Sequence, residues 1–258
     1  MDLHCYRRPE VAMEYRVLGP LEVLDGNGRT LSLGGAQQQS VLALLLLRAD
    51  RTLATESLVA ELWEEPPATA SRTVQAYVSR LRQELRVGAI ESRPGGYALL
   101  LEGDRLDLRV FERSAEEGRA ALASSDYDRA AQLLREALEL WRGPALTGLA
   151  SEPLRREADR LEETRLQVLE DRVEADLGRG RHREVVPELQ ALVEDHPFRE
   201  RLRAQLMLAL YRCARVGEAL ELYRQTHRLL ISELGIEPSD ELRALERAIL
   251  QKAPPSSS

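Results

Sequence analysis

The sequence predicts an α+β N-terminal part, made of short strands, three helices and a hairpin, followed by an all-α part built from helical repeats. Two observations predict this division. Before residue 104, short apolar runs alternate with turn residues, which is the pattern of antiparallel strands. After residue 104, apolar residues recur every three or four positions among many charges, which is the pattern of amphipathic helices. We therefore place a domain boundary between residues 103 and 104.

The first patterned segment, residues 14–33, is predicted to form a small antiparallel sheet. Apolar runs are separated there by turn residues such as Gly19 and Pro20. The predicted strands are residues 15–18, 21–24 and 30–33. Residues 1–12 lack such a pattern, and we expect them to be a disordered extension.

Helical periodicity then predicts three helices, with start and stop signals at their ends. They are residues 36–49, 55–63 and 70–86. Thr55 is the expected N-cap of the second helix, which ends before Pro66 and Pro67 because proline cannot continue the helical hydrogen bonds. Thr69 or Ser71 is expected to cap the third helix.

Residues 89–101 alternate around Pro94-Gly95-Gly96, a turn signal that predicts a β-hairpin. Arg93 lies next to this turn, and we expect it either to contact DNA, in the minor groove or at a phosphate, or to be an ordinary exposed arginine. The order along the chain is thus sheet, three helices and hairpin.

A degenerate repeat is visible in the all-α part. Small and apolar residues recur at the spacing of a tetratricopeptide unit, in which small residues let two antiparallel helices approach closely. The three imperfect units contain Gly118, Ala130, Leu134 and Ala137, then Val185, Leu189, Leu192 and Pro197, then Ala219, Tyr223 and Thr226. Residues 141–161 form an insertion between the first two units, and a helix at 239–250 follows the third. We therefore predict an all-α tetratricopeptide-like repeat domain at 104–252 and a disordered tail at 253–258.

Charge and composition restrict the partners. The chain has 36 Lys and Arg against 43 Asp and Glu, a formal net charge of −7, so any contact with DNA must be local rather than chain-wide. It contains no apolar stretch long enough to cross a bilayer and no secretory signal, so we predict no membrane partner and a cytoplasmic, nucleoid-associated protein. Cys5 and Cys213 lie far apart in sequence, and no disulfide or metal site is expected.

No pattern typical of an enzyme is present. The four histidines share no metal-ligand spacing, and neither a phosphate-binding loop nor a nucleophile elbow occurs. The carboxylates lie three or four residues from arginines, as in Glu157 and Arg160, and we interpret them as solvated ion pairs. We therefore expect no catalytic residue, no cofactor and no metal.

The third predicted helix, 70–86, combines an apolar stripe with a polar face. Val74, Val78, Leu81 and Leu85 recur at helical spacing and should face the core. The other side suits a DNA major groove, because arginine can reach guanine or phosphate and glutamine can pair with adenine. The candidate DNA-binding residues are Arg72, Thr73, Gln75, Ala76, Ser79, Arg80, Arg82, Gln83 and Arg86. The alternative is a merely solvated arginine face.

Within this set we expect the arginines mainly to contact phosphates, while Gln75 and Ser79, with Arg80 or Arg82, read bases. Residues 72–93 hold five arginines and two glutamates, a local charge of +3 on an acidic chain. Such local positive charge is expected of a helix that docks on DNA.

These residues resemble a known family. Residues 71–85, with the hairpin at 90–99, are similar to the OmpR-type winged helix. The segments at 15–21 and at 233–243 extend the similarity to the SARP family, the Streptomyces antibiotic regulatory proteins, over residues 13–250.

The resemblance implies a winged-helix DNA-binding domain at 13–103 and a bacterial transcriptional activation domain at 104–252. It also implies a transcriptional activator of a secondary-metabolite (antibiotic) gene cluster. Such an activator binds direct repeats in double-stranded DNA as a homodimer and recruits RNA polymerase holoenzyme. In OmpR-type domains the loop between the second and third helices faces polymerase, which assigns that contact to Glu64 and Glu65; an acidic turn without a partner is the alternative. Two other functions remain open: a helical-repeat adaptor that binds protein, and a repressor.

Overall fold

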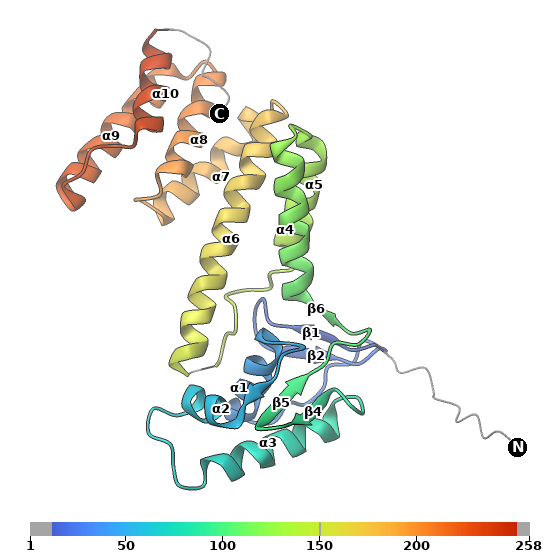
Figure 1. Cartoon of the computed structure of the whole chain (residues 1–258). Helices are drawn as coiled ribbons and strands as arrows, with labels where there is room; N and C mark the ends of the chain where they lie inside the picture. Colours follow the sequence, from blue (N-terminus) through green and yellow to red (C-terminus); the bar gives the residue numbers. More distant parts are fainter. Residues whose placement is uncertain (1–11, 150, 252–258) are drawn as a thin grey trace, which may run out of the picture. The chain divides into compact units, whose positions relative to one another are not determined.

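The computed structural model describes residues 12–149 and 151–251 and divides the chain into two compact units (Figure 1). Unit 1 comprises Met1–Ala115 and Glu136–Leu166, and unit 2 comprises Glu116–Arg135 and Gln167–Ser258. The predicted N-terminal extension, apart from its last residue, and the predicted tail lie outside the described residues. Among the residues described, no helix combines the length and the apolar character that crossing a bilayer requires.

Unit 1 contains two three-stranded sheets. The first has the order β2-β1-β6, in which β1 pairs antiparallel with β2 and parallel with β6. These strands are β1 (Glu14–Arg16), β2 (Glu22–Leu24) and β6 (Arg105–Leu106). The second has the order β3-β5-β4, is antiparallel throughout, and contains the predicted hairpin. Its strands are β3 (Leu53–Ala54), β4 (Ile90–Arg93) and β5 (Gly96–Leu99).

Two predictions about the strands are wrong. Residues 30–33 form no strand; Thr30 makes an isolated bridge to Leu24, and the chain enters a helix soon afterwards, at Ala36. Strand structure also continues past residue 104, because β6 pairs with β1 from Arg105 onward. A two-residue strand is too short to produce an alternating pattern, so the sequence does not reveal it.

The three predicted helices of the N-terminal part are confirmed, with ends one or two residues earlier than expected. They are α1 (Ala36–Leu47), α2 (Thr55–Leu62) and α3 (Ala70–Glu84). The expected cap at Thr55 is wrong: Ala54 is the N-cap, and the Thr55 N–H instead donates to Gly95 O at 2.9 Å. Thr69 does occupy the N-cap position of α3, but its side chain makes no capping hydrogen bond.

The start of α4 (Asp107–Ala123) belongs to unit 1 because Asp107 binds the segment after β1. Its carboxylate accepts hydrogen bonds from the backbone N–H groups of Val17, at 2.9 Å, and Leu18, at 3.0 Å. Asp107 is 3% exposed; burial raises its pKa above the usual value, and the backbone donors oppose that rise. The predicted domain boundary thus lies within a compact unit, and as a division between domains it stays a prediction.

The predicted insertion, residues 141–161, also packs within unit 1. The Trp141 ring meets Phe111 edge-on, with centroids 5.4 Å apart. The Arg142 N–H donates to Leu18 O at 2.9 Å. Two segments that are distant in sequence, the start of α4 and this insertion, therefore bind the same short piece of chain after β1.

Unit 2 is helical, as predicted. Within it, α8 packs against α7, α9 and α10. The helices that contribute to it are α4, α5 (Tyr127–Glu139), α6 (Glu152–Gly178), α7 (His182–Asp195), α8 (Glu200–Arg212), α9 (Val216–Leu234) and α10 (Asp240–Leu250). A Cβ on Gly118 would lie 2.6 Å from Leu134 Cγ, so glycine permits the close approach of α4 and α5 that the repeat predicts.

Some carboxylates of α6 are buried rather than solvated. Glu170 is 1% exposed and its Oε1 lies 2.7 Å from Arg199 Nε, while Asp171 Oδ1 lies 2.7 Å from Arg201 Nη1. The solvated pair of Glu157 and Arg160 is confirmed, with 2.6 Å between Oε1 and Nη2. For Glu170 and Asp171 the interpretation as solvated charges is wrong, because both are buried and bound by Arg201 of α8 or by Arg199, its N-cap residue.

Candidate nucleic-acid interface

Helix α3 has the two faces that the sequence predicts. Val74, Val78 and Leu81 are at most 1% exposed, and Leu85, just after the helix, is 5% exposed. Burying each of these side chains contributes about 1.5–3 kcal/mol, which holds α3 against α1 and α2. The opposite side of the helix is thereby turned to solvent.

The exposed side, which we term the α3 polar face, contains six of the predicted DNA-binding residues. They are Arg72, Gln75, Ala76, Ser79, Arg80 and Gln83. Among the residues that the structure describes, Arg72 and Arg80 form no ion pair or hydrogen bond through their side chains. These two guanidinium groups are therefore available to an anion, and Ala76 and Ser79 leave room for its close approach.

Arg82 lies on the flank of α3 that faces the hairpin. Its Nε donates to Ile90 O at 3.0 Å and its Nη2 to Ser92 Oγ at 2.9 Å. Its guanidinium carbon lies 5.8 Å from the centroid of the Tyr97 ring. Arg82 therefore joins α3 to the hairpin, although its side chain remains exposed. Thr73 is half-buried, and its hydroxyl donates to Thr69 O at 3.1 Å.

Arg86 does not lie on the α3 polar face, and its expected contact with DNA stays a prediction. Its Nε lies 2.7 Å from Asp104 Oδ2, and the two side chains are 9% and 1% exposed. Its Nη2 also donates to Leu100 O at 2.9 Å. Because α3 ends at Glu84, Arg86 no longer follows the helical positions and turns into the protein as an internal ion pair.

The β4–β5 hairpin packs closely against β3. Arg93 lies on the hairpin face opposite to the one that meets Arg82. A Cβ on Gly96 would be 2.1 Å from Leu53 O, so only glycine fits beside β3. Arg93 Nη2 lies 3.3 Å from Glu91 Oε2. Since side chains alternate along a strand, Arg93 and Glu91 share the face opposite to Ser92, which meets Arg82. The structure therefore does not bring Arg93 together with the α3 polar face.

Two residues that sequence reasoning missed lie at the other flank of α3. The Tyr77 hydroxyl donates to Gln37 Oε1 at 2.7 Å, which joins α3 to the N-terminus of α1. Tyr77 is half-buried and Gln37 is exposed. The run of glutamines at 37–39 was the only signal in the sequence, and it does not reveal which helix lies beside it.

The loop between α2 and α3 carries Glu64 and Glu65, both exposed. Among the described residues, neither side chain forms an ion pair or a hydrogen bond. The structure thus places the two acids at the surface, as a contact with another protein would require.

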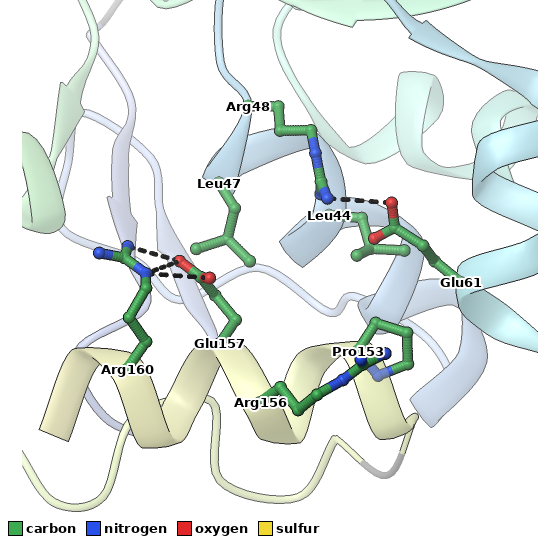
Figure 2. Close-up of a pocket in the computed structure, with 8 residues that line it drawn as sticks. All are labelled: Leu44, Leu47, Arg48, Glu61, Pro153, Arg156, Glu157 and Arg160. Atoms are coloured by element: carbon green, nitrogen blue, oxygen red, sulfur yellow. Dashed lines mark hydrogen bonds and ion pairs between the residues drawn. The ribbon is translucent and has the colours of Figure 1, made fainter. Parts of the chain in front are cut away.

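A cavity of about 630 Å³ in unit 1 holds no catalytic arrangement (Figure 2). It is lined by Leu44, Leu47, Arg48, Glu61, Pro153, Arg156, Glu157 and Arg160. Each of its carboxylates is paired: Glu61 Oε1 lies 2.9 Å from Arg48 Nη2, and Glu157 Oε1 lies 2.6 Å from Arg160 Nη2. Elsewhere in the described part of the chain, no cluster of His, Cys, Asp and Glu could hold a metal ion.

Comparisons with known proteins agree with this architecture. Residues 28–99 match the family described as "Transcriptional regulatory protein, C terminal", and residues 106–250 match the "Bacterial transcriptional activator domain". The chain is 40% identical to the regulatory protein DnrI of Streptomyces peucetius over 255 residues, covering 94% of this chain and 93% of DnrI. It is 46% identical to the regulatory protein AfsR of Streptomyces coelicolor over 94% of this chain but only 25% of AfsR, so it spans a quarter of that relative.

A solved structure is similar as well: Mycobacterium tuberculosis EmbR in complex with a low affinity phosphopeptide. Its TM-score is 0.89 at 33% identity, covering 94% of this chain and 66% of that one. The relatives named here are regulatory proteins rather than enzymes, as the sequence predicted. The chain belongs to the SARP family of transcriptional regulators, which join an OmpR-type DNA-binding domain to a bacterial transcriptional activator domain.

Proposed function

We propose that this chain is a sequence-specific transcriptional activator whose α3 polar face enters the major groove of double-stranded DNA. The observation that carries the proposal is the pair of exposed, unengaged arginines, Arg72 and Arg80, beside the small residues Ala76 and Ser79. Arg86, at the end of the same predicted helix, is instead bound by a carboxylate. Uncompensated cations on one helix face give an acidic protein the local positive charge that phosphates attract.

Four residues of the α3 polar face have proposed contacts with DNA. Arg72 contacts phosphate, Arg80 contacts phosphate or guanine, and Gln75 and Ser79 read base edges. Arg82 holds the hairpin against α3 and, from that position, contacts the sugar-phosphate backbone of the DNA. Arg86 is left out of the interface because Asp104 engages it. Arg93 contacts DNA only from the far face of the hairpin.

Membership of the SARP family supports a proposal about pairing and partners. We propose that two protomers bind direct repeats in a head-to-tail arrangement, with half-sites about one helical turn apart. Glu64 and Glu65 then meet a basic surface of RNA polymerase holoenzyme. The regulated genes are those of a secondary-metabolite (antibiotic) cluster, and the protein acts at the nucleoid in the cytoplasm.

Selection of bound duplexes from a random pool tests the proposal directly. We expect the selected sequences to contain tandem copies of one short site. Substitution Arg72→Ala or Arg80→Ala should weaken binding to all duplexes, and a lost phosphate contact should lower the salt dependence by about one unit. Gln75→Ala should relax the preference at one base position, at a cost of about 1–3 kcal/mol.

Arg113→Ala is the matched control, because Arg113 is also exposed and without a partner among the described residues but lies on α4. It should leave DNA affinity unchanged. If the α3 variants bind the selected duplex as tightly as the Arg113 variant does, α3 is not the reading helix. If no sequence is enriched, the adaptor function replaces this one.

A further inference from the structure

Helix α1 begins at an uncapped N-terminus. Its N-cap is Gly35, no side chain makes a capping hydrogen bond, and its first turn contains no acidic residue. The first backbone hydrogen bond of the helix runs from Gln39 N–H to Gly35 O. The N–H groups of residues 36–38 therefore have no helical acceptor, and the aligned peptide dipoles give this end of α1 a partial positive charge.

A largely buried glutamine whose amide has no partner among the described residues lies at the same place. Gln38 is 5% exposed, and its Nε2 and Oε1 lie 2.9 and 3.0 Å from the position that a Cβ would take on Gly34. Within the described residues, this amide makes no hydrogen bond. The amide end of this largely buried side chain is not cut off from the surface, so its NH₂ group can donate to a ligand with acceptor oxygens. Gly34 and Gly35 are both exposed and leave the approach open.

The N-terminus of α1 borders the α3 polar face. Arg82 joins one flank of α3 to the hairpin, and Tyr77, on the other flank, donates to Gln37 Oε1. That hydrogen bond occupies the oxygen of the Gln37 amide and leaves its NH₂ group, on an exposed side chain, as a further donor. The α3 polar face thus lies between the hairpin on one side and a group of N–H donors on the other.

We propose that the N-terminus of α1 binds a backbone phosphate of the duplex whose major groove receives α3. A phosphate diester carries one negative charge and two free oxygens, which match the N–H groups of residues 36–38 and the amides of Gln37 and Gln38. The inference rests on the proposed function, because a helix in the major groove has a phosphate backbone along each flank. Such a contact carries no base information, but it sets the position and depth of α3.

Gly35 allows a matched test with two substitutions. Its backbone is extended, with φ −77° and ψ 168°, and nothing lies within 4 Å of a Cβ placed there. Aspartate and asparagine are both good N-caps, so Gly35→Asp and Gly35→Asn should be at least as stable as the unchanged chain. Only the aspartate adds a negative charge where the phosphate should lie. We expect Gly35→Asp to bind the selected duplex about tenfold more weakly than Gly35→Asn does.

A neutral methylphosphonate, placed at each backbone position of the selected duplex in turn, identifies the phosphate. At one position the unchanged chain should lose affinity, and there the difference between the two Gly35 variants should disappear. Equal affinities of the two variants would overturn the phosphate site, and so would a difference that no methylphosphonate removes, because the repulsion would then be long-range. If the unchanged chain shows no preference for the selected duplex over random duplex, the proposed function itself fails.

Discussion

Arg80 and Arg86 have opposite environments although both are arginines of one predicted helix. Arg80 is exposed and has no carboxylate partner among the described residues, whereas Arg86 is bound by Asp104. An arginine in an internal pair has lost its hydration and has its charge neutralised, so transferring it to a phosphate would leave Asp104 uncompensated. Availability to DNA is therefore set by the carboxylate neighbours of each arginine and cannot be read from the residue type.

At the residue scale, Asp107→Asn should destabilise the protein. The carboxylate accepts from the N–H groups of Val17, Leu18 and Leu108, and an amide NH₂ in place of one oxygen would face a backbone donor. A buried donor left without an acceptor costs about 2 kcal/mol in the free energy of unfolding, measurable by urea titration of the whole chain. Asp159→Asn, at an exposed position on α6, is the control and should change the free energy of unfolding by less than about 0.5 kcal/mol. Equal effects of the two substitutions would contradict the role of Asp107.

At the scale of elements, the β4–β5 hairpin depends on backbone contacts. Gly96 leaves room for Leu53 O, Gly95 O accepts from the Thr55 N–H, and Arg82 bonds to two groups of β4. The hairpin is thus connected to β3, α2 and α3 at once. We infer that the hairpin is rigid, because each of these contacts would have to break for it to move.

Gly96→Ala should therefore separate β5 from β3. The added methyl group would lie 2.1 Å from Leu53 O, so the backbone must shift, at a cost of about 3 kcal/mol in the free energy of unfolding. The same substitution at Gly217, in α9, meets nothing within 4 Å and should be neutral or stabilising by under about 1 kcal/mol. Urea unfolding followed by circular dichroism compares the two. A Gly96→Ala protein as stable as the unchanged chain would show that β3 does not restrict the hairpin.

At the scale of the whole molecule, the compact units do not follow the order of the domains along the chain. Asp107 and Arg142 bind the segment at residues 17–18 from positions that follow the DNA-binding domain in sequence. Trp141 adds an aromatic contact with Phe111 of α4. The DNA-binding part is thus completed by residues of the activation domain.

A fragment that ends at residue 103 should accordingly be less stable than one that ends at residue 166. The shorter fragment lacks Asp107, the acceptor for the N–H groups of Val17 and Leu18, and it lacks the packing of the insertion. Together these changes should lower the free energy of unfolding by about 3 kcal/mol or more. The urea midpoints of the two fragments provide the measurement. Coincident midpoints would mean that α4 and the insertion add nothing to unit 1.

Sequence alone determined the local elements and the class of the protein. Strong periodicity predicts α3 and its buried stripe, and Pro94-Gly95-Gly96 predicts the hairpin, because these signals are local and depend on the period of side-chain burial. The polar set on α3 follows from the same periodicity, and six of its members lie together on the α3 polar face.

Tertiary structure decided which of these residues remain available and what lies beside them. Three features depend on segments that are distant along the chain. They are the ion pair of Arg86 with Asp104, the hydrogen bond from Tyr77 to Gln37, and the pairing of the two-residue strand β6 with β1. A sequence pattern records the period of burial but not the partner that covers a residue, because partners are chosen by three-dimensional packing. For this reason helix α3 and its polar face were predictable, whereas the flanks of α3 and the extent of unit 1 were not.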